Sequence, residues 1–102
     1  MHNDFIIYED KDLTILADPM NLGTLKANET KEFTFYLYNS SADPYQELKL
    51  SVDHKELTII SAPLELKEKT SGQFILEWKA TVDVKRNLKP TLKTEGFKVL
   101  PL

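Results

Sequence analysis

The sequence contains no cysteine and only three glycines in 102 residues. The absence of cysteine excludes disulfides and every metal site that needs a thiolate ligand. Three glycines can hardly build a phosphate-binding loop, and neither a G-x-S-x-G nor a His-x-x-x-His motif occurs. The only histidines are His2 and His54. We therefore expect a protein that is not an enzyme and has no metal or other cofactor.

A basic excess and a long apolar run are missing as well. The net charge is -3, so the molecule offers no positive field to nucleic acid. No apolar segment approaches the length that crosses a bilayer, and the opening MHNDFIIYEDKD lacks the basic and apolar regions of a signal peptide. We expect no nucleic-acid partner, no membrane contact, no small-molecule substrate, and synthesis inside a cell.

Helical periodicity is scarce, and alternation of apolar with polar residues dominates instead. The strand candidates are DFIIYED, LTILAD, KEFTFYLYN, QELKLSV, LTIIS, LELKE, QFILEWKATVDV and TLKTEGFKVL. Turn signals separate them every eight to twelve residues, which is typical of antiparallel β-sandwiches. The sequence predicts one all-β domain over residues 1–102, with an antiparallel sandwich of about seven to eight strands.

The apolar phase of each strand predicts its buried side. The longest alternating set is Phe74, Leu76, Trp78, Ala80, Val82 and Val84. We expect Trp78 at the centre of the core, flanked by Phe35, Leu37, Leu50 and Leu76. The apolar phase changes across Gly96, which predicts a bulge or bend in the final strand.

Two polar segments match the glycosylation sequon: Asn28-Glu29-Thr30 and Asn39-Ser40-Ser41. The same residue types favour turns, and no secretory signal accompanies them. We therefore interpret both segments as turns.

NLGTLKANETKEFTFYLYNSS, followed by LTIISAPLELKEKTSGQFILEW, resembles the immunoglobulin-like sandwich of the major-sperm-protein/ASH type. The resemblance covers residues 20 to about 98. It implies an immunoglobulin-like fold without the antibody disulfide, as in small structural (decoration) proteins of bacteriophages. Members of this type serve as adaptors, as polymerising cytoskeletal units and as modules on larger assemblies.

The segment VDHKE offers only Asp53, His54 and Glu56 as possible members of a catalytic or metal site. A catalytic or metal site needs convergent partners at fixed spacing. We interpret this segment as a solvated turn between two strands.

Two surfaces remain as candidates for binding. If Phe33, Phe35 and Leu37 face inward, Tyr36 and Tyr38 face outward, and exposed tyrosines are enriched at interfaces but also stabilise ordinary sheet faces. Acidic residues gather near the start of the chain and basic residues near its end; they either pair across neighbouring strands or form a polarised docking surface. The candidate partner-binding residues are Tyr36, Tyr38, Tyr45, Lys85, Arg86 and Lys89.

These features favour a non-enzymatic structural or binding module. The first hypothesis is an accessory protein of a bacteriophage virion, a capsid decoration or tail-surface component, made in the host cytoplasm and attached non-covalently to a protein lattice. Such a module is a monomer or a lattice-dependent oligomer. The alternative is a cytoplasmic adaptor of the major-sperm-protein kind that binds a short peptide or partner protein at a sheet edge or face.

Overall fold

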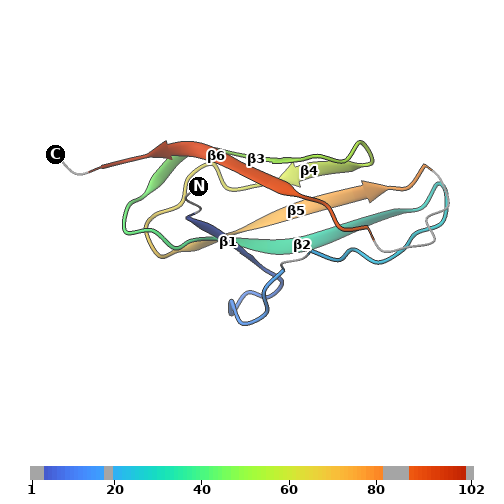
Figure 1. Cartoon of the computed structure of the whole chain (residues 1–102), viewed down its shortest axis with the longest axis horizontal. Helices are drawn as coiled ribbons and strands as arrows, with labels where there is room; N and C mark the ends of the chain where they lie inside the picture. Colours follow the sequence, from blue (N-terminus) through green and yellow to red (C-terminus); the bar gives the residue numbers. More distant parts are fainter. Residues whose placement is uncertain (1–3, 18–19, 82–87, 101–102) are drawn as a thin grey trace.

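The computed structural model describes residues 4–17, 20–81 and 88–100, and these form six strands in two antiparallel sheets (Figure 1). The larger sheet has the order β1 (Phe5–Tyr8), β2 (Thr30–Asn39), β5 (Ser71–Lys79) and β4 (Leu57–Ser61). The smaller sheet pairs β3 (Tyr45–Val52) with β6 (Leu92–Lys98). The all-β, antiparallel prediction is confirmed, but the described residues form six strands and not seven to eight.

One of the missing strands is LTILAD, in whose described residues Leu16 alone forms a bridge, with Tyr8. The carboxylate of Asp10 accepts hydrogen bonds from the backbone N–H groups of Thr14 (2.9 Å) and Ile15 (2.8 Å). These donors are therefore used in a local turn and are not available to a sheet ladder.

The other missing strand is LELKE, whose Leu66 bridges to Tyr45. The backbone N–H of Leu48 also donates to the carbonyl of Leu64 (2.8 Å). Residues 64–66 therefore cover the edge of β3 that faces away from β6, although they are too irregular to count as a strand.

The core forms where the inward phases of β2, β5 and β3 meet. Phe35 lies opposite Phe74 in the register of β2 and β5, and their rings stack at 5.7 Å between centroids. Trp78 is fully buried in the same cluster, together with Leu50 from the smaller sheet. The prediction of a buried Trp78 is confirmed, while Val82 and Val84 lie outside the described residues.

Leu37 does not belong to the tryptophan cluster, contrary to expectation. It is buried in a second cluster with Leu48 and Leu66. The phase of β2 was predicted correctly, since Leu37 does face inward, but β2 is ten residues long and spans both clusters. The position of Leu37 along β2 decides which cluster it joins. Alternation predicts the side on which a residue lies but not its position along the strand.

A bulge lies opposite Gly96, and its extra residue is on β3. The pairs Gln46–Phe97 and Lys49–Glu95 are in register, so Glu47 and Leu48 together face Gly96. Glu47 takes a positive φ of 53°. The predicted irregularity is confirmed, but the strand that absorbs it is the partner of the last strand.

Both sequon segments lie where β2 meets a turn. Asn28 adopts φ 68° in the turn before β2. Asn39, the last residue of β2, is fully buried; its Nδ2 donates to the carbonyls of Asp43 (3.0 Å), Leu66 (3.2 Å) and Lys67 (3.2 Å). The turn interpretation is confirmed for both.

Over the described part of the chain there is no helix with the length and apolar character to cross a membrane.

Candidate protein-interaction surfaces

The outer face of the larger sheet carries three tyrosines, here called the tyrosine face: Tyr8, Tyr36 and Tyr38. Tyr8 of β1 pairs directly with Tyr36 of β2. The rings of Tyr8 and Tyr38 meet edge to face, with centroids 6.2 Å apart. Ile6 lies opposite Tyr38, and all four side chains are half-buried.

Tyr8 was not among the residues predicted for this surface. Its own segment, FIIY, has too few polar positions to define an inward phase, and only pairing with β2 determines which side it takes. The tyrosine face thus holds the predicted Tyr36 and Tyr38 and one tyrosine that sequence analysis missed.

Tyr45 is held at a different place, between the two sheets. Its hydroxyl donates to the carboxylate of the buried Asp4, and its ring contacts Phe5 edge to face at 4.7 Å. Lys98 from β6 approaches the same carboxylate at 3.1 Å and lies 5.7 Å from the centre of the Tyr45 ring. Burial and the neighbouring Asp4 raise the pKa of Tyr45 to about 12. The contacts of Tyr45 are therefore internal, away from the tyrosine face.

The Asp4–Lys98 pair also bears on the uneven charge of the chain. An acidic residue near the start and a basic residue near the end do neutralise each other across the two sheets, as one of the two interpretations expected. Of the basic candidates for partner binding, Lys89 is exposed, and Lys85 and Arg86 lie outside the described residues.

Lys89 stands at a cleft of about 650 Å³ between β1 and the segment that leads into β6. The cleft is lined mainly by apolar side chains, among them Ile7, Met20 and Leu92. A positive charge beside a groove of mixed polar and apolar surface suits an extended peptide that carries an acidic group.

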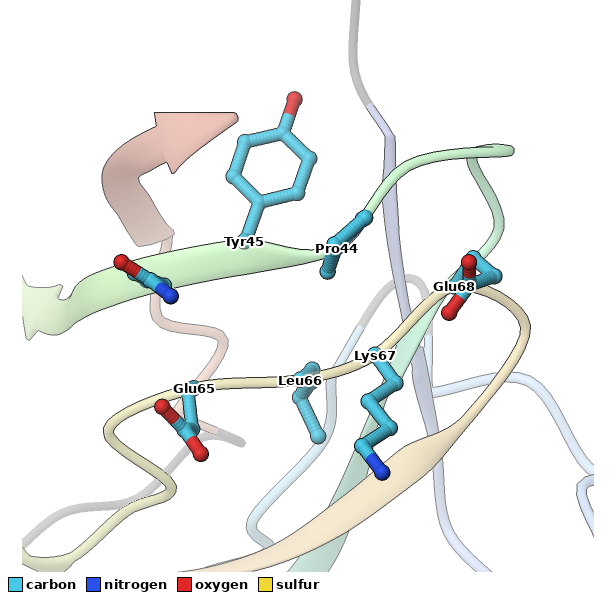
Figure 2. A pocket seen from close by; sticks show the side chains of 7 residues that line it. Pro44, Tyr45, Glu65, Leu66, Lys67 and Glu68 are labelled. Carbon is cyan, nitrogen blue, oxygen red and sulfur yellow. The ribbon is translucent and has the colours of Figure 1, made fainter. Parts of the chain in front are cut away.

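A second, shallow pocket of about 410 Å³ lies between the start of β3 and residues 65–68 (Figure 2). Backbone hydrogen bonds join its two walls: the N–H of Tyr45 donates to Leu66 (2.9 Å) and that of Leu66 to Tyr45 (3.1 Å). Figure 2 shows the ring of Tyr45 directed away from the segment that carries Leu66. Glu65 and Glu68 line the same pocket and are exposed. The pocket thus combines apolar carbon with exposed carboxylates and is open to a partner's surface.

The VDHKE turn is less solvated than predicted, because Glu56 is buried. The indole Nε1 of Trp78 donates to one carboxylate oxygen of Glu56 (3.0 Å), and the backbone N–H of Thr81 donates to the other (2.9 Å). The hydroxyl of Thr81 also donates a hydrogen bond to the Glu56 carboxylate. Together these donors lower the pKa of Glu56 to about 2; the Thr81 hydroxyl contributes most, followed by the backbone N–H of Thr81 and the indole N–H of Trp78. This role of Glu56 was not predicted from the sequence, although a buried tryptophan needs an acceptor for its N–H.

The other two residues of that turn also have local partners. The Nδ1 atom of His54 accepts the backbone N–H of Glu56 (3.1 Å), and Asp53 accepts the backbone N–H of Thr91 (3.1 Å). In the part of the chain that the structure describes, no group of three or more His, Asp or Glu residues could hold a metal ion.

Comparisons of the chain with protein-family models, with curated proteins and with solved structures find no match. The class of the protein therefore follows from its architecture alone: an all-β protein of two antiparallel sheets around a common core.

Proposed function

We propose that this chain is a non-enzymatic binding module that attaches non-covalently to a larger protein assembly through the tyrosine face. The observation that carries the proposal is the gathering of Tyr8, Tyr36 and Tyr38 on an outer sheet surface. Tyrosine offers a large contact area at a low cost in conformational entropy, and its hydroxyl remains able to bond a partner.

The surroundings of the tyrosine face support a protein partner. Ile6 and Ile75 lie on the same outer phase of the sheet as Tyr36 and Tyr38, since Ile6 pairs with Tyr38 and Ile75 with Thr34. A half-buried patch of aromatic and aliphatic side chains on paired strands is preorganised for contact.

The specific assembly we propose is a bacteriophage particle, with this chain as a capsid decoration or tail-surface component in the virion. The resemblance to immunoglobulin-like domains of the major-sperm-protein/ASH type and the two-sheet, antiparallel architecture support this proposal. On a repeating lattice, weak contacts by many copies gain strength through effective concentration.

The alternative is a cytoplasmic adaptor that binds a short peptide. The cleft beside Lys89 favours it, because its mixed polar and apolar lining and the exposed Lys89 suit an extended, acidic segment of a partner.

The test is co-sedimentation with phage particles assembled without this chain. The double variant Tyr36→Ser/Tyr38→Ser should lower bound protein about tenfold or more, since aromatic anchors dominate binding energy at interfaces. Leu64→Ser is the matched control, because it removes an exposed apolar side chain elsewhere and should bind like the parent. Tryptophan fluorescence of the buried Trp78 verifies that each variant is folded.

Unchanged binding by the double variant would exclude the tyrosine face, and a salt titration would then test the charged ends of the chain. A parent protein that binds no particle, but captures an acidic peptide in a manner lost in Lys89→Glu, would exclude the virion and support the adaptor.

A further inference from the structure

The last strand presents one edge that is not paired within the described residues. Thr91 directs its backbone to β3: its carbonyl accepts from Asp53 N–H (3.3 Å) and its N–H donates to the Asp53 side chain (3.1 Å). The N–H of Val99 also points to that side, toward Pro44 (2.8 Å). Because backbone groups alternate along an antiparallel strand, the even-numbered residues direct theirs away from β3. The outward set is Leu92, Thr94, Gly96 and Lys98.

No backbone hydrogen bond reaches this outer edge from any residue that the structure describes. An edge of this kind is a template for pairing with another strand. Figure 1 shows β6 running beside β3 toward the C-terminus.

The exposed face of β6 carries two opposite charges that flank Thr94. The side chains of Lys93 and Glu95 are 73% and 58% exposed, and their Nζ and Oε1 atoms are 3.1 Å apart. Phe97 follows on the same phase and is 67% exposed. The exposed face of the strand therefore carries, in chain order, a positive group (Lys93), a negative group (Glu95) and an aromatic group (Phe97).

This order is complementary to itself when two copies run antiparallel. If the pairing is centred on Thr94, Lys93 of each copy lies opposite Glu95 of the other. A centre on Lys93 or on Glu95 places like charges opposite each other, and a centre on Gly96 places Glu95 against Phe97. Of these four centres, only Thr94 sets unlike charges opposite each other, and it is favoured because directly opposed side chains of a sheet interact and like charges repel.

The same register uses the free backbone groups. Thr94 exchanges hydrogen bonds with Thr94 of the second copy, and Leu92 does so with Gly96, since all three direct their N–H and C=O groups outward. A two-fold axis through Thr94 relates the copies, as an isologous interface requires.

We propose that β6 pairs edge to edge with β6 of a second copy of this chain, forming a two-fold dimer centred on Thr94. The result is a continuous four-stranded sheet in the order β3-β6-β6-β3. The interface is one strand wide and has few apolar contacts, so association is weak, with a dissociation constant between about 10 µM and about 1 mM. The tyrosine face lies outside this dimer interface, so the dimer does not depend on the attachment that we propose for that face.

Sedimentation equilibrium of the purified chain alone, at low salt and over that concentration range, tests the proposal. The parent should rise from monomer toward dimer mass as concentration increases. Lys93→Glu and Glu95→Lys should each raise the dissociation constant about tenfold or more, because both cross-strand pairs then become like-charged. An equimolar mixture of the two variants should associate about as well as the parent, since every opposed pair is again of opposite sign.

Two further variants test whether association depends on the outer edge of β6 and not on net charge in general. Thr94→Pro removes an outward N–H without removing a hydrogen bond to β3, and should abolish the dimer while the domain stays folded. Lys67→Glu changes the net charge as much as Lys93→Glu but lies on the segment along the opposite edge of β3, and should leave the dimer unchanged.

The proposal is overturned if the parent stays monomeric throughout the range. It is equally overturned if Lys67→Glu weakens association as much as Lys93→Glu, or if the mixture of folded charge variants fails to recover it. Because no particle or peptide is present, none of these results depends on the proposed virion attachment.

Discussion

The carboxylate of Glu56 is buried and accepts hydrogen bonds from the indole of Trp78 and from the backbone and hydroxyl of Thr81. Three donors on one carboxylate favour its ionised form, which is why its pKa falls from 4.5 to about 2. At the scale of single residues, this contact supplies the polar partner that allows the tryptophan to lie fully inside the core.

A lowered pKa in the folded state means that Glu56 stabilises the fold above its unfolded pKa. That contribution is complete above pH 4.5 and is lost as the pH falls from there toward about 2. Glu56→Gln should lower the free energy of unfolding by about 1–3 kcal/mol at pH 7, because the amide cannot accept on both sides. Urea unfolding at several pH values measures this; the gap between parent and variant should narrow in acid. The prediction would be contradicted if the difference in free energy of unfolding between parent and variant did not change between pH 2 and pH 5.

At the scale of elements, the bulge of β3 depends on the absence of a side chain at position 96. A Cβ atom on Gly96 would lie 2.8 Å from Leu48 Cδ2 and 3.2 Å from the carbonyl oxygen of Gln46. Leu48 is itself buried in the second cluster, so it has little room to withdraw. The two strands of the smaller sheet can therefore approach at this point only with glycine.

Gly96→Ala should destabilise the domain by about 1–3 kcal/mol, the usual cost of overpacking. A double-mutant cycle with Leu48→Ala provides the control, because the truncated side chain no longer meets the new methyl group. The cost of Gly96→Ala should be smaller in that background. Equal costs in both backgrounds would show that the close contact with Leu48 is not the cause.

At the scale of the whole molecule, Asp4, Tyr45 and Lys98 join the two sheets at one end. Asp4 immediately precedes β1 of the larger sheet, whereas Tyr45 and Lys98 belong to the two strands of the smaller one. The buried carboxylate is compensated by a hydroxyl and an ammonium group, and removing one of them leaves it less well satisfied.

Tyr45→Phe should lower the free energy of unfolding by about 1–2 kcal/mol at neutral pH, since it removes one hydrogen bond to a buried charge. The raised pKa of Tyr45 adds a pH dependence: its contribution is complete below pH 10.0 and is lost as the pH rises through about 12. Thermal unfolding of parent and variant across that range measures it. Tyr36→Phe is the control and should change stability by less than about 0.5 kcal/mol; an equal effect of both variants would refute the special role of Tyr45.

The pattern of residues along the chain was enough to predict the fold class and the inward phase of the main strands. Alternation is a local property, so Phe35, Phe74 and Trp78 could be assigned to the core without knowing their neighbours. The turns at Asn28 and Asn39 followed from residue chemistry that acts within a few positions.

Which segments meet depended on how the whole chain folds. Pairing of β1 with β2 joined Tyr8 to Tyr36, and pairing of β4 with β5 brought Thr81 to Glu56, while packing of one sheet on the other placed Tyr45 beside Asp4. These contacts link residues 25 to 41 positions apart and depend on strand order and on where each turn closes, neither of which alternation encodes. The expected strands around Leu16 and Leu66 became single bridges for the same physical reason, although their apolar pattern was suitable. Near Leu16, backbone donors are engaged in a local turn with Asp10. The segment around Leu66 meets only a short stretch of β3.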